Sequence, residues 1–206
     1  MTITIDTIVF DLGKVLLDWD PRYFYRRFFP GDEAALEQFI AEAITHDWVL
    51  GMDRGQPVAD AVGRHAAALP QHAELIRRWP QGWPQMLRGE LADSVAILDA
   101  LERAGYPLYA LTNFSTETWP VAVARCPVLQ RFRHVVISGE IGLVKPDAAI
   151  YDYTIERCAL QPARTLFIDD LAANVEAARA AGLQAVQFTG APALRHDLAA
   201  LGVRLA

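Results

Sequence analysis

A short apolar run that ends in a single carboxylate, TIVFD at Thr7–Asp11, constrains the fold of this chain more than any other stretch. Its residues are mainly the β-branched and aromatic types that favour strands, and an uninterrupted apolar run is typical of a parallel sheet buried on both faces. Gly13 then allows a tight turn beside the carboxylate. Because ligands of open α/β sheets bind at the carboxyl ends of the strands, Asp11 is predicted to stand at that edge. Taken alone, Asp11 could equally be a polar strand end or a helix cap.

From Ala92 onward, helical and strand patterns alternate along the chain. Predicted helices cover residues 94–105, 116–125, 146–160 and 174–182, and predicted strands cover residues 107–113, 134–139, 164–170 and 183–188. Such alternation predicts an α/β fold, in which helices cover both faces of a Rossmann-like parallel sheet.

The stretch between Pro21 and Arg88 shows helical periodicity and no convincing strand. Three prolines, Pro21, Pro57 and Pro70, fall where a helix could begin. The tract WPQGWPQML at residues 79–87 breaks the helical pattern and is predicted to mark the return to the main domain. We therefore expect a helical cap at residues 17–88, inserted after the first strand into a core domain of residues 1–16 and 89–206.

Bulk properties exclude several classes of protein. With 206 residues, 52% of them hydrophobic, the chain should bury its own core, and its net charge of −6 argues against a nucleic-acid partner. No run of about 18 apolar residues predicts a membrane span, and the start MTITID lacks signal-peptide features, so a cytoplasmic location is expected. Cys126 and Cys158 have no metal-ligand spacing and are expected to be small core residues. A monomer and a homodimer both remain open.

Polar side chains follow four of the predicted strands, where parallel strands bring them to one edge of the sheet. They are Asp11, Thr112, Asn113, Lys145, Asp169 and Asp170. Each alone has an ordinary structural explanation, as a helix cap, a turn residue or a loop lysine. Their shared position at strand ends instead predicts a site for a metal-bound phosphate.

The residue types suit that chemistry. Asp11 and Asp170 offer the hard oxygen ligands that Mg²⁺ prefers. A metal also screens the repulsion between a carboxylate and a phosphate, which is about 4 kcal/mol at 4 Å and an effective dielectric constant near 20. Lys145 can neutralise the phosphate and keep Asp11 ionised, while Thr112 and Asn113 can donate hydrogen bonds to its oxygens.

Four segments, VFDLG, LTN, GLVKP and FIDDLAANV, resemble in content and order the motifs of the haloacid dehalogenase (HAD) superfamily, and the similarity covers essentially the whole chain. The branch that looks most similar contains the alpha-glucose-1-phosphate phosphatases and the amino-terminal phosphatase domain of soluble epoxide hydrolases. The resemblance implies an Mg²⁺-dependent phosphatase that hydrolyses a small phosphomonoester, such as a sugar phosphate, through an aspartyl-phosphate.

The resemblance also implies a role for each matching residue. Asp11 would be the nucleophile, and the phosphate would be bound by Thr112, Asn113 and Lys145. Mg²⁺ would be held by Asp11, by Asp170 with Asp169 behind it, and by the backbone carbonyl of Gly13. Asn174 would orient the acidic pair.

Gly13 is a departure from the family pattern, because the usual phosphatase has an aspartate there that acts as general acid and base. General acid–base catalysis contributes a factor of about 10² to 10⁴, or roughly 3 to 5 kcal/mol. Some similar members of the glucose-1-phosphate phosphatase branch also carry glycine, so a lack of activity does not follow. We expect substrates with good leaving groups, such as sugar 1-phosphates, to need the acid least.

Two alternatives remain. A metal-independent haloacid dehalogenase also lacks the second aspartate, but Leu12–Gly13 and Asp169–Asp170 differ from its usual motifs. A non-catalytic phosphate-binding homologue is supported only by Gly13. A response-regulator receiver is disfavoured because its acidic pair precedes the phosphoacceptor and it has no helical cap. Residues of the cap that could face the cleft, none of which is assigned to the site, are Arg22, His46, Asp47, Trp48, Arg54, Trp79 and Trp83.

Overall fold

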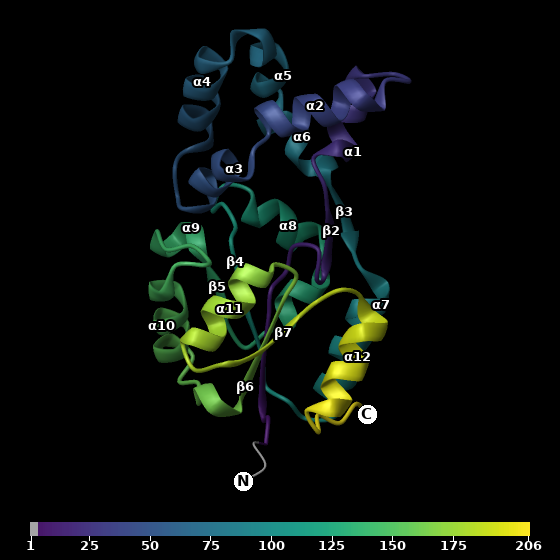
Figure 1. Ribbon diagram of the computed structural model, residues 1–206, viewed down its shortest axis with the longest axis vertical. Helices are drawn as coiled ribbons and strands as arrows, with labels where there is room; N and C mark the ends of the chain where they lie inside the picture. The colour runs from purple at the N-terminus through teal and green to yellow at the C-terminus, as the bar shows by residue number, and fades with distance from the viewer. Residues whose placement is uncertain (1–3) are drawn as a thin grey trace.

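A five-stranded parallel sheet with β1 (Thr7–Phe10) at its centre organises the protein in the computed structural model, which describes residues 4–206 (Figure 1). The strand order is β5-β4-β1-β6-β7. The other strands are β4 (Leu108–Thr112), β5 (Val135–Ile137), β6 (Thr165–Asp169) and β7 (Gln184–Gln187). Ile8 of β1 pairs with Leu108 on one side and with Leu166 on the other. The predicted α/β fold class is confirmed.

Helices cover both faces of this sheet (Figure 1). Successive strand residues point to opposite faces, so Ile8 and Phe10 pack in one hydrophobic cluster and Val9 in another. The first cluster includes buried residues of α7 (Ala92–Arg103) and α12 (Ala191–Ala200), and the second those of α10 (Ala148–Arg157) and α11 (Ala172–Ala180). Shorter elements complete the core: α8 (Trp119–Arg125), η3 (Pro127–Arg131), α9 (Ser138–Ile141) and η4 (Pro162–Arg164).

A helical segment between two short antiparallel strands, β2 (Leu17–Trp19) and β3 (Leu87–Glu90), lies beyond the carboxyl edge of the sheet (Figure 1). The segment contains α1 (Arg22–Tyr25), η1 (Arg26–Phe28), α2 (Glu33–Ala43), α3 (His46–Asp53), α4 (Val58–Ala68), η2 (Pro70–His72), α5 (Ala73–Arg77) and α6 (Trp79–Met86). Pro21 and Pro57 directly precede helices and Pro70 begins one, as the sequence predicts. The strand pair was not predicted, because strands of three and four residues are too short to show alternation. The predicted domain division at residues 16/17 falls directly before β2, the division at 88/89 falls within β3, and both stay predictions.

Of the proline-rich tract at residues 79–87, all but Leu87, which begins β3, forms the helix α6, and the prediction that the tract breaks the helical pattern was wrong. Pro80 occupies the first turn, where its missing N–H costs nothing, but Pro84 lies inside the helix. Trp79, Trp83 and Met86 are buried, so packing of one helical face outweighs the low helix propensity of proline.

Three contacts fasten the cap to the core near the end of α3. The Ser138 hydroxyl donates a hydrogen bond of 2.6 Å to the backbone carbonyl of Asp53. The Arg54 guanidinium forms an ion pair of 3.0 Å with Asp147, and the backbone N–H of Val58 donates to Glu117 at 2.8 Å. The C-terminal end of α3 is therefore held at a fixed position above the sheet.

Two further predictions concern membranes and cysteines. Among the described residues, no helix combines the length and the apolar character that crossing a bilayer requires. Both cysteines are free; Cys126 is buried in the first hydrophobic cluster, and Cys158 packs against the second.

Candidate active site

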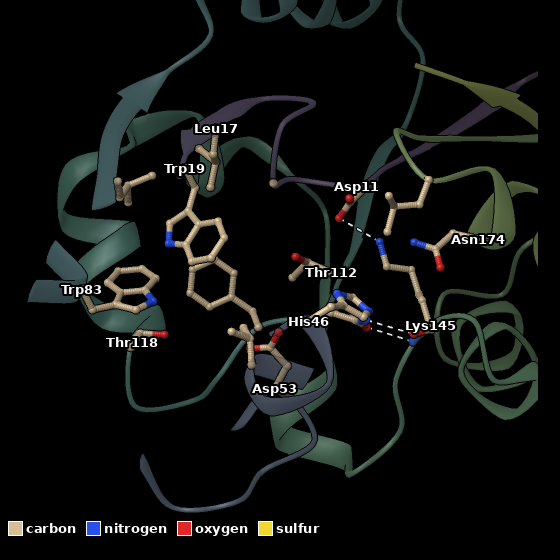
Figure 2. A pocket seen from close by; sticks show the side chains of 16 residues that line it. Asp11, Leu17, Trp19, His46, Asp53, Trp83, Thr112, Thr118, Lys145 and Asn174 are labelled. Carbon is tan, nitrogen blue, oxygen red and sulfur yellow. Dashed lines mark hydrogen bonds and ion pairs between the residues drawn. The ribbon is translucent and has the colours of Figure 1, made fainter. Parts of the chain in front are cut away.

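A cavity of about 170 Å³ lies between the carboxyl edge of the sheet and the cap (Figure 2). Asp11 follows β1, Thr112 is the last residue of β4, and Lys145 enters from the loop before α10. The backbone N–H of Asp11 donates to Ile168 of β6 at 2.8 Å, so the sheet ladder fixes the start of this turn. Parallel pairing thus places residues that are distant in sequence around one cavity, as predicted.

Lys145 is the charge that links the acidic residues. Its Nζ lies 2.8 Å from Oδ1 of Asp11 and 2.6 Å from Oδ2 of Asp169, and its side chain is only 2% exposed. Two hydrogen bonds fix its backbone, because Lys145 N donates to Oδ1 of Asn113 at 2.8 Å and Nδ2 of Asn113 donates back to the Lys145 carbonyl at 3.0 Å. The side chain of Asn113 therefore holds the lysine in place and is not directed at a phosphate.

Three carboxylates, those of Asp11, Asp169 and Asp170, each place an oxygen within 4.8 Å of the other two. Both carboxylate oxygens of Asp169 already accept hydrogen bonds within the protein. Nδ2 of Asn174 donates to both of them at 2.9 and 3.1 Å, and the backbone N–H of Leu171 donates to Oδ1 at 2.9 Å. Asp11 and Asp170 are then the residues best placed to offer oxygens to a cation. This donor set fits Mg²⁺, which usually takes one or two carboxylates and completes its shell with other oxygens.

Burial dominates the electrostatics of these groups. It raises the pKa of Asp11 to about 7, with Asp169 and Asp170 adding to the rise and Lys145 opposing it. Burial also raises the pKa of Asp170, again with help from Asp169. For Lys145, burial disfavours the charged form, but the carboxylates of Asp11 and Asp169 outweigh it and raise the pKa. A divalent cation among the carboxylates would restore the ionised form of Asp11.

Gly13 and Thr112 line the cavity beside Asp11. Thr112 is almost fully buried. A Cβ atom on Gly13 would meet no other atom within 4 Å, so the missing side chain leaves open space and is not a packing requirement. The turn after Gly13 closes through a hydrogen bond of 2.8 Å from the backbone N–H of Lys14 to Leu17.

The wall opposite the carboxylates is largely apolar, which the sequence pattern does not predict. Of the cap residues considered above, His46 and Trp83 line the cavity; Arg22 instead pairs with Asp20 and Glu37, and Arg54 with Asp147. Apolar residues that line the cavity are Leu17, Trp19, Val49, Trp83, Leu87, Phe114 and Leu171.

Asp53 is the functional candidate that sequence reasoning missed, since it looks like an ordinary polar residue at a helix end. It is the last residue of α3, it is half-buried, and its carboxylate enters the cavity from the cap (Figure 2). Burial raises the pKa of Asp53 to about 7; a hydrogen bond from the backbone of Ser115 and the charge of Lys145 oppose the rise, and the charge of Asp11 adds to it.

Comparison with known proteins agrees with this geometry. The profile of the haloacid dehalogenase-like hydrolase family matches residues 5–182. The chain belongs to this family. The HAD motifs that the sequence resembles are thus the residues that the fold brings together around the cavity.

Individual relatives include phosphatases. The chain is 31% identical over 141 residues, 64% of its length, to Phosphatase MT3486 of Mycobacterium tuberculosis, of which it spans 61%. It is 25% identical over 206 residues to the sesquiterpene phosphatase astK of Aspergillus oryzae, covering 96% of this chain and 97% of that one. For three further curated relatives, the chain spans only 28%, 27% and 33% of the relative's own length.

The fold is also that of solved structures. The HAD family enzyme BT-2542 of Bacteroides thetaiotaomicron, crystallised with magnesium and inorganic phosphate, superposes with a TM-score of 0.67 over 89% of this chain and 93% of that one, at 22% identity. This likeness supports the Rossmann-like fold with a cap.

Proposed function

We propose that this HAD-like hydrolase is an Mg²⁺-dependent phosphatase that acts on a small phosphomonoester through a phosphorylated Asp11. The observation that carries the proposal is the cluster in which Lys145 bridges Asp11 and Asp169 while Asp170 lies within 4.8 Å of both carboxylates. Two relatives that are phosphatases and a structural neighbour that holds magnesium and phosphate support it.

The residues divide the work by position. An Asp11 oxygen would attack phosphorus, while Lys145 and the Thr112 hydroxyl would bind the phosphate oxygens. Asn113 would contribute indirectly, by holding the backbone of Lys145, and Asn174 by orienting Asp169. Bound through Asp11, Asp170 and the carbonyl of Gly13, Mg²⁺ would supply positive charge that offsets the repulsion between carboxylate and phosphate.

The wall of the cavity bears on the substrate. Trp19, Trp83 and Phe114 lie where the alcohol part of a phosphomonoester would sit, and aromatic and aliphatic surfaces favour an apolar group. The cavity volume of about 170 Å³ suits a small molecule. We therefore propose a compact apolar or aromatic alcohol ahead of the free sugar that the family resemblance suggests. A cytoplasmic location and a monomeric or homodimeric state stay predictions.

The test is phosphate release from a panel that contains p-nitrophenyl phosphate, phenyl phosphate, short alkyl phosphates and sugar 1-phosphates. Each substrate is assayed with Mg²⁺ and with EDTA, for the wild type and for Asp11→Asn. We expect release that requires Mg²⁺ and disappears in Asp11→Asn, with phenyl and alkyl phosphates preferred. A folded protein that is silent across the panel would contradict the proposal, and halide release from 2-haloacids without metal would favour a dehalogenase.

A further inference from the structure

The proposed phosphatase reaction, on which this inference rests, needs a group that moves protons. When the P–O bond of the substrate breaks, the departing alkoxide needs a proton, and the water that attacks the phosphorylated aspartate must lose one. Gly13 has no side chain to do either. The titratable side chains among the described residues that line the cavity are Asp11, His46, Asp53 and Lys145.

Two of these four groups have other tasks. Asp11 forms the covalent bond. Lys145 is buried in ion pairs with Asp11 and Asp169 at 2.8 and 2.6 Å, and both carboxylates favour its charged form, so it is a poor proton donor. His46 and Asp53 remain, at opposite ends of α3.

Position separates the two remaining groups. His46 is exposed at the start of the helix, whereas Asp53 is half-buried and enters the cavity from the cap (Figure 2). The charges of Asp11 and Lys145 both influence the Asp53 carboxyl, which places it in the same electrostatic environment as the nucleophile. Asp53 is thus the half-buried acid that the cap contributes to the cavity.

The structure also holds Asp53 in place. Its backbone carbonyl accepts the hydrogen bond from Ser138, and the following residue, Arg54, is paired with Asp147 of the core. Gly139 also packs against it, since an added Cβ would lie 3.4 Å from the Asp53 carbonyl oxygen, at van der Waals distance. A proton donor must be positioned before the reaction, and these contacts fix the helix end that carries it.

We propose that Asp53 is the general acid and base of this enzyme, supplied by the cap in place of a side chain at position 13. In the first step, an Asp11 oxygen bonds to phosphorus, the bond from phosphorus to the alcohol oxygen breaks, and the proton of the Asp53 carboxyl moves to that oxygen. In the second step, water bonds to phosphorus, its proton moves to the Asp53 carboxylate, and the bond from phosphorus to Asp11 breaks. Phosphate leaves, and both aspartates return to their starting forms.

The protonation state of Asp53 suits both steps. With its pKa raised to about 7 by burial, the carboxyl is divided between its acid and base forms near neutral pH, which is where a group that must donate and then accept works best. The groups that set this balance are Asp11, which raises the pKa, and the Ser115 backbone and Lys145, which lower it. His46 lies on the same helix, and Arg54 is paired with Asp147.

The experiment compares Asp53→Asn with Asp53→Glu and with Asp47→Asn, an exposed aspartate on the same helix. We expect Asp53→Asn to lower kcat by about 10² to 10⁴-fold for alkyl and phenyl phosphates. The rate of the first step with p-nitrophenyl phosphate should fall much less, because p-nitrophenolate leaves without a proton. With this substrate, phosphorylated Asp11 should therefore accumulate, and intact-protein mass spectrometry after an acid quench should detect it. Asp53→Glu should keep part of the activity, and Asp47→Asn should match the wild type.

Several results would overturn the assignment. If Asp53→Asn folds and keeps the wild-type kcat, or changes KM alone, Asp53 only contacts substrate or supports the cap. The same loss for every leaving group, with an unchanged pH profile, would also exclude proton transfer. If His46→Gln shows the leaving-group dependence and Asp53→Asn does not, the role belongs to His46. A wild type that releases no phosphate would overturn the proposed function and this inference together.

Discussion

The ammonium group of Lys145 lies 2.8 Å from a carboxylate oxygen of Asp11, and both side chains are buried. The same ammonium lies 2.6 Å from Asp169. Three like charges, on Asp11, Asp169 and Asp170, would repel one another at this edge of the sheet if the lysine were absent. The pair therefore has a structural role in addition to the catalytic role proposed for it.

Lys145→Met should lower the stability of the folded protein, because it leaves buried carboxylates without their partner. Removing one member of a buried ion pair costs about 3 to 5 kcal/mol. Urea unfolding at neutral pH with EDTA measures the effect. Arg133→Met is the control, since Arg133 is exposed, and should change the free energy of unfolding by less than about 0.5 kcal/mol. Equal effects for the two variants would contradict the structural role of Lys145.

Asn174→Ala should weaken Mg²⁺ binding without removing a ligand. Asn174 donates hydrogen bonds to both oxygens of Asp169. Residues that orient the carboxylates around a metal in this way typically change the affinity for the metal by about 10 to 100-fold. The Mg²⁺ concentration that gives half of the thermal stabilisation by the metal provides the readout, independently of activity. An unchanged midpoint would show that the orientation of Asp169 does not influence the metal.

The fold and the acidic cluster could be predicted because parallel strands impose a simple rule. Each buried strand reads as an apolar run, and the polar residue after it must lie at the carboxyl edge. That rule predicts the positions of Asp11, Thr112 and Asp169, which stand at strand ends, whereas Lys145 is separated from β5 by the short helix α9. The roles given to the site residues stay predictions, but the contacts of Asn174 with Asp169 agree with an orienting role.

The cap side could not be predicted in the same way. Whether a residue of an amphipathic helix faces the cavity depends on how that helix packs, and Asp53 at the end of α3 has no local signal. The side chain of Asn113 illustrates the limit at the sheet edge as well. Its position was predicted, but it bonds to the Lys145 backbone, which a sequence pattern does not reveal.

Gly13→Asp should fold and should compensate for the loss of Asp53. A Cβ at Gly13 meets no atom within 4 Å, and its backbone is not among those with positive φ, so an aspartate fits without strain. In the Asp53→Asn background, the added carboxylate should recover at least about tenfold of the lost kcat for alkyl phosphates, within the range that general acid–base catalysis supplies. In the wild-type background the gain should be smaller. No recovery in the double variant would indicate that proton transfer is not what Asp53→Asn removes.

Asp53→Asn should stabilise the fold at alkaline pH and not at acidic pH. The pKa of Asp53 is raised from 3.8 to about 7 in the folded state, so folding favours the protonated form. The folded state becomes less stable as pH rises from about 4 to about 7, and asparagine escapes this loss. The gain at pH 8 is at most about 4 kcal/mol, since the carboxyl is partly accessible. Thermal melts of both proteins at pH 4.5 and pH 8, with EDTA, give the difference; a gain of equal size at both values would contradict the raised pKa.

Gly139→Ala and Gly63→Ala should change stability in opposite directions. A Cβ on Gly139 would lie 2.8 Å from the backbone oxygen of Phe114 and 3.0 Å from the backbone nitrogen of Thr116, and neither can move as a flexible side chain would. The alanine must displace this loop relative to α9, whose Ser138 hydroxyl binds the Asp53 carbonyl, at a cost of about 1 to 3 kcal/mol. Because that displacement also shifts Asp53, kcat should fall together with stability.

Gly63→Ala is the control. Gly63 is exposed within α4 and its Cβ would meet nothing within 4 Å, so alanine there should add about 1 kcal/mol to the free energy of unfolding through helix propensity and leave kcat unchanged. Urea unfolding and phosphate release on both variants test the pair, and a Gly139→Ala protein with wild-type stability and kcat would show that the close packing of cap and core does not position Asp53.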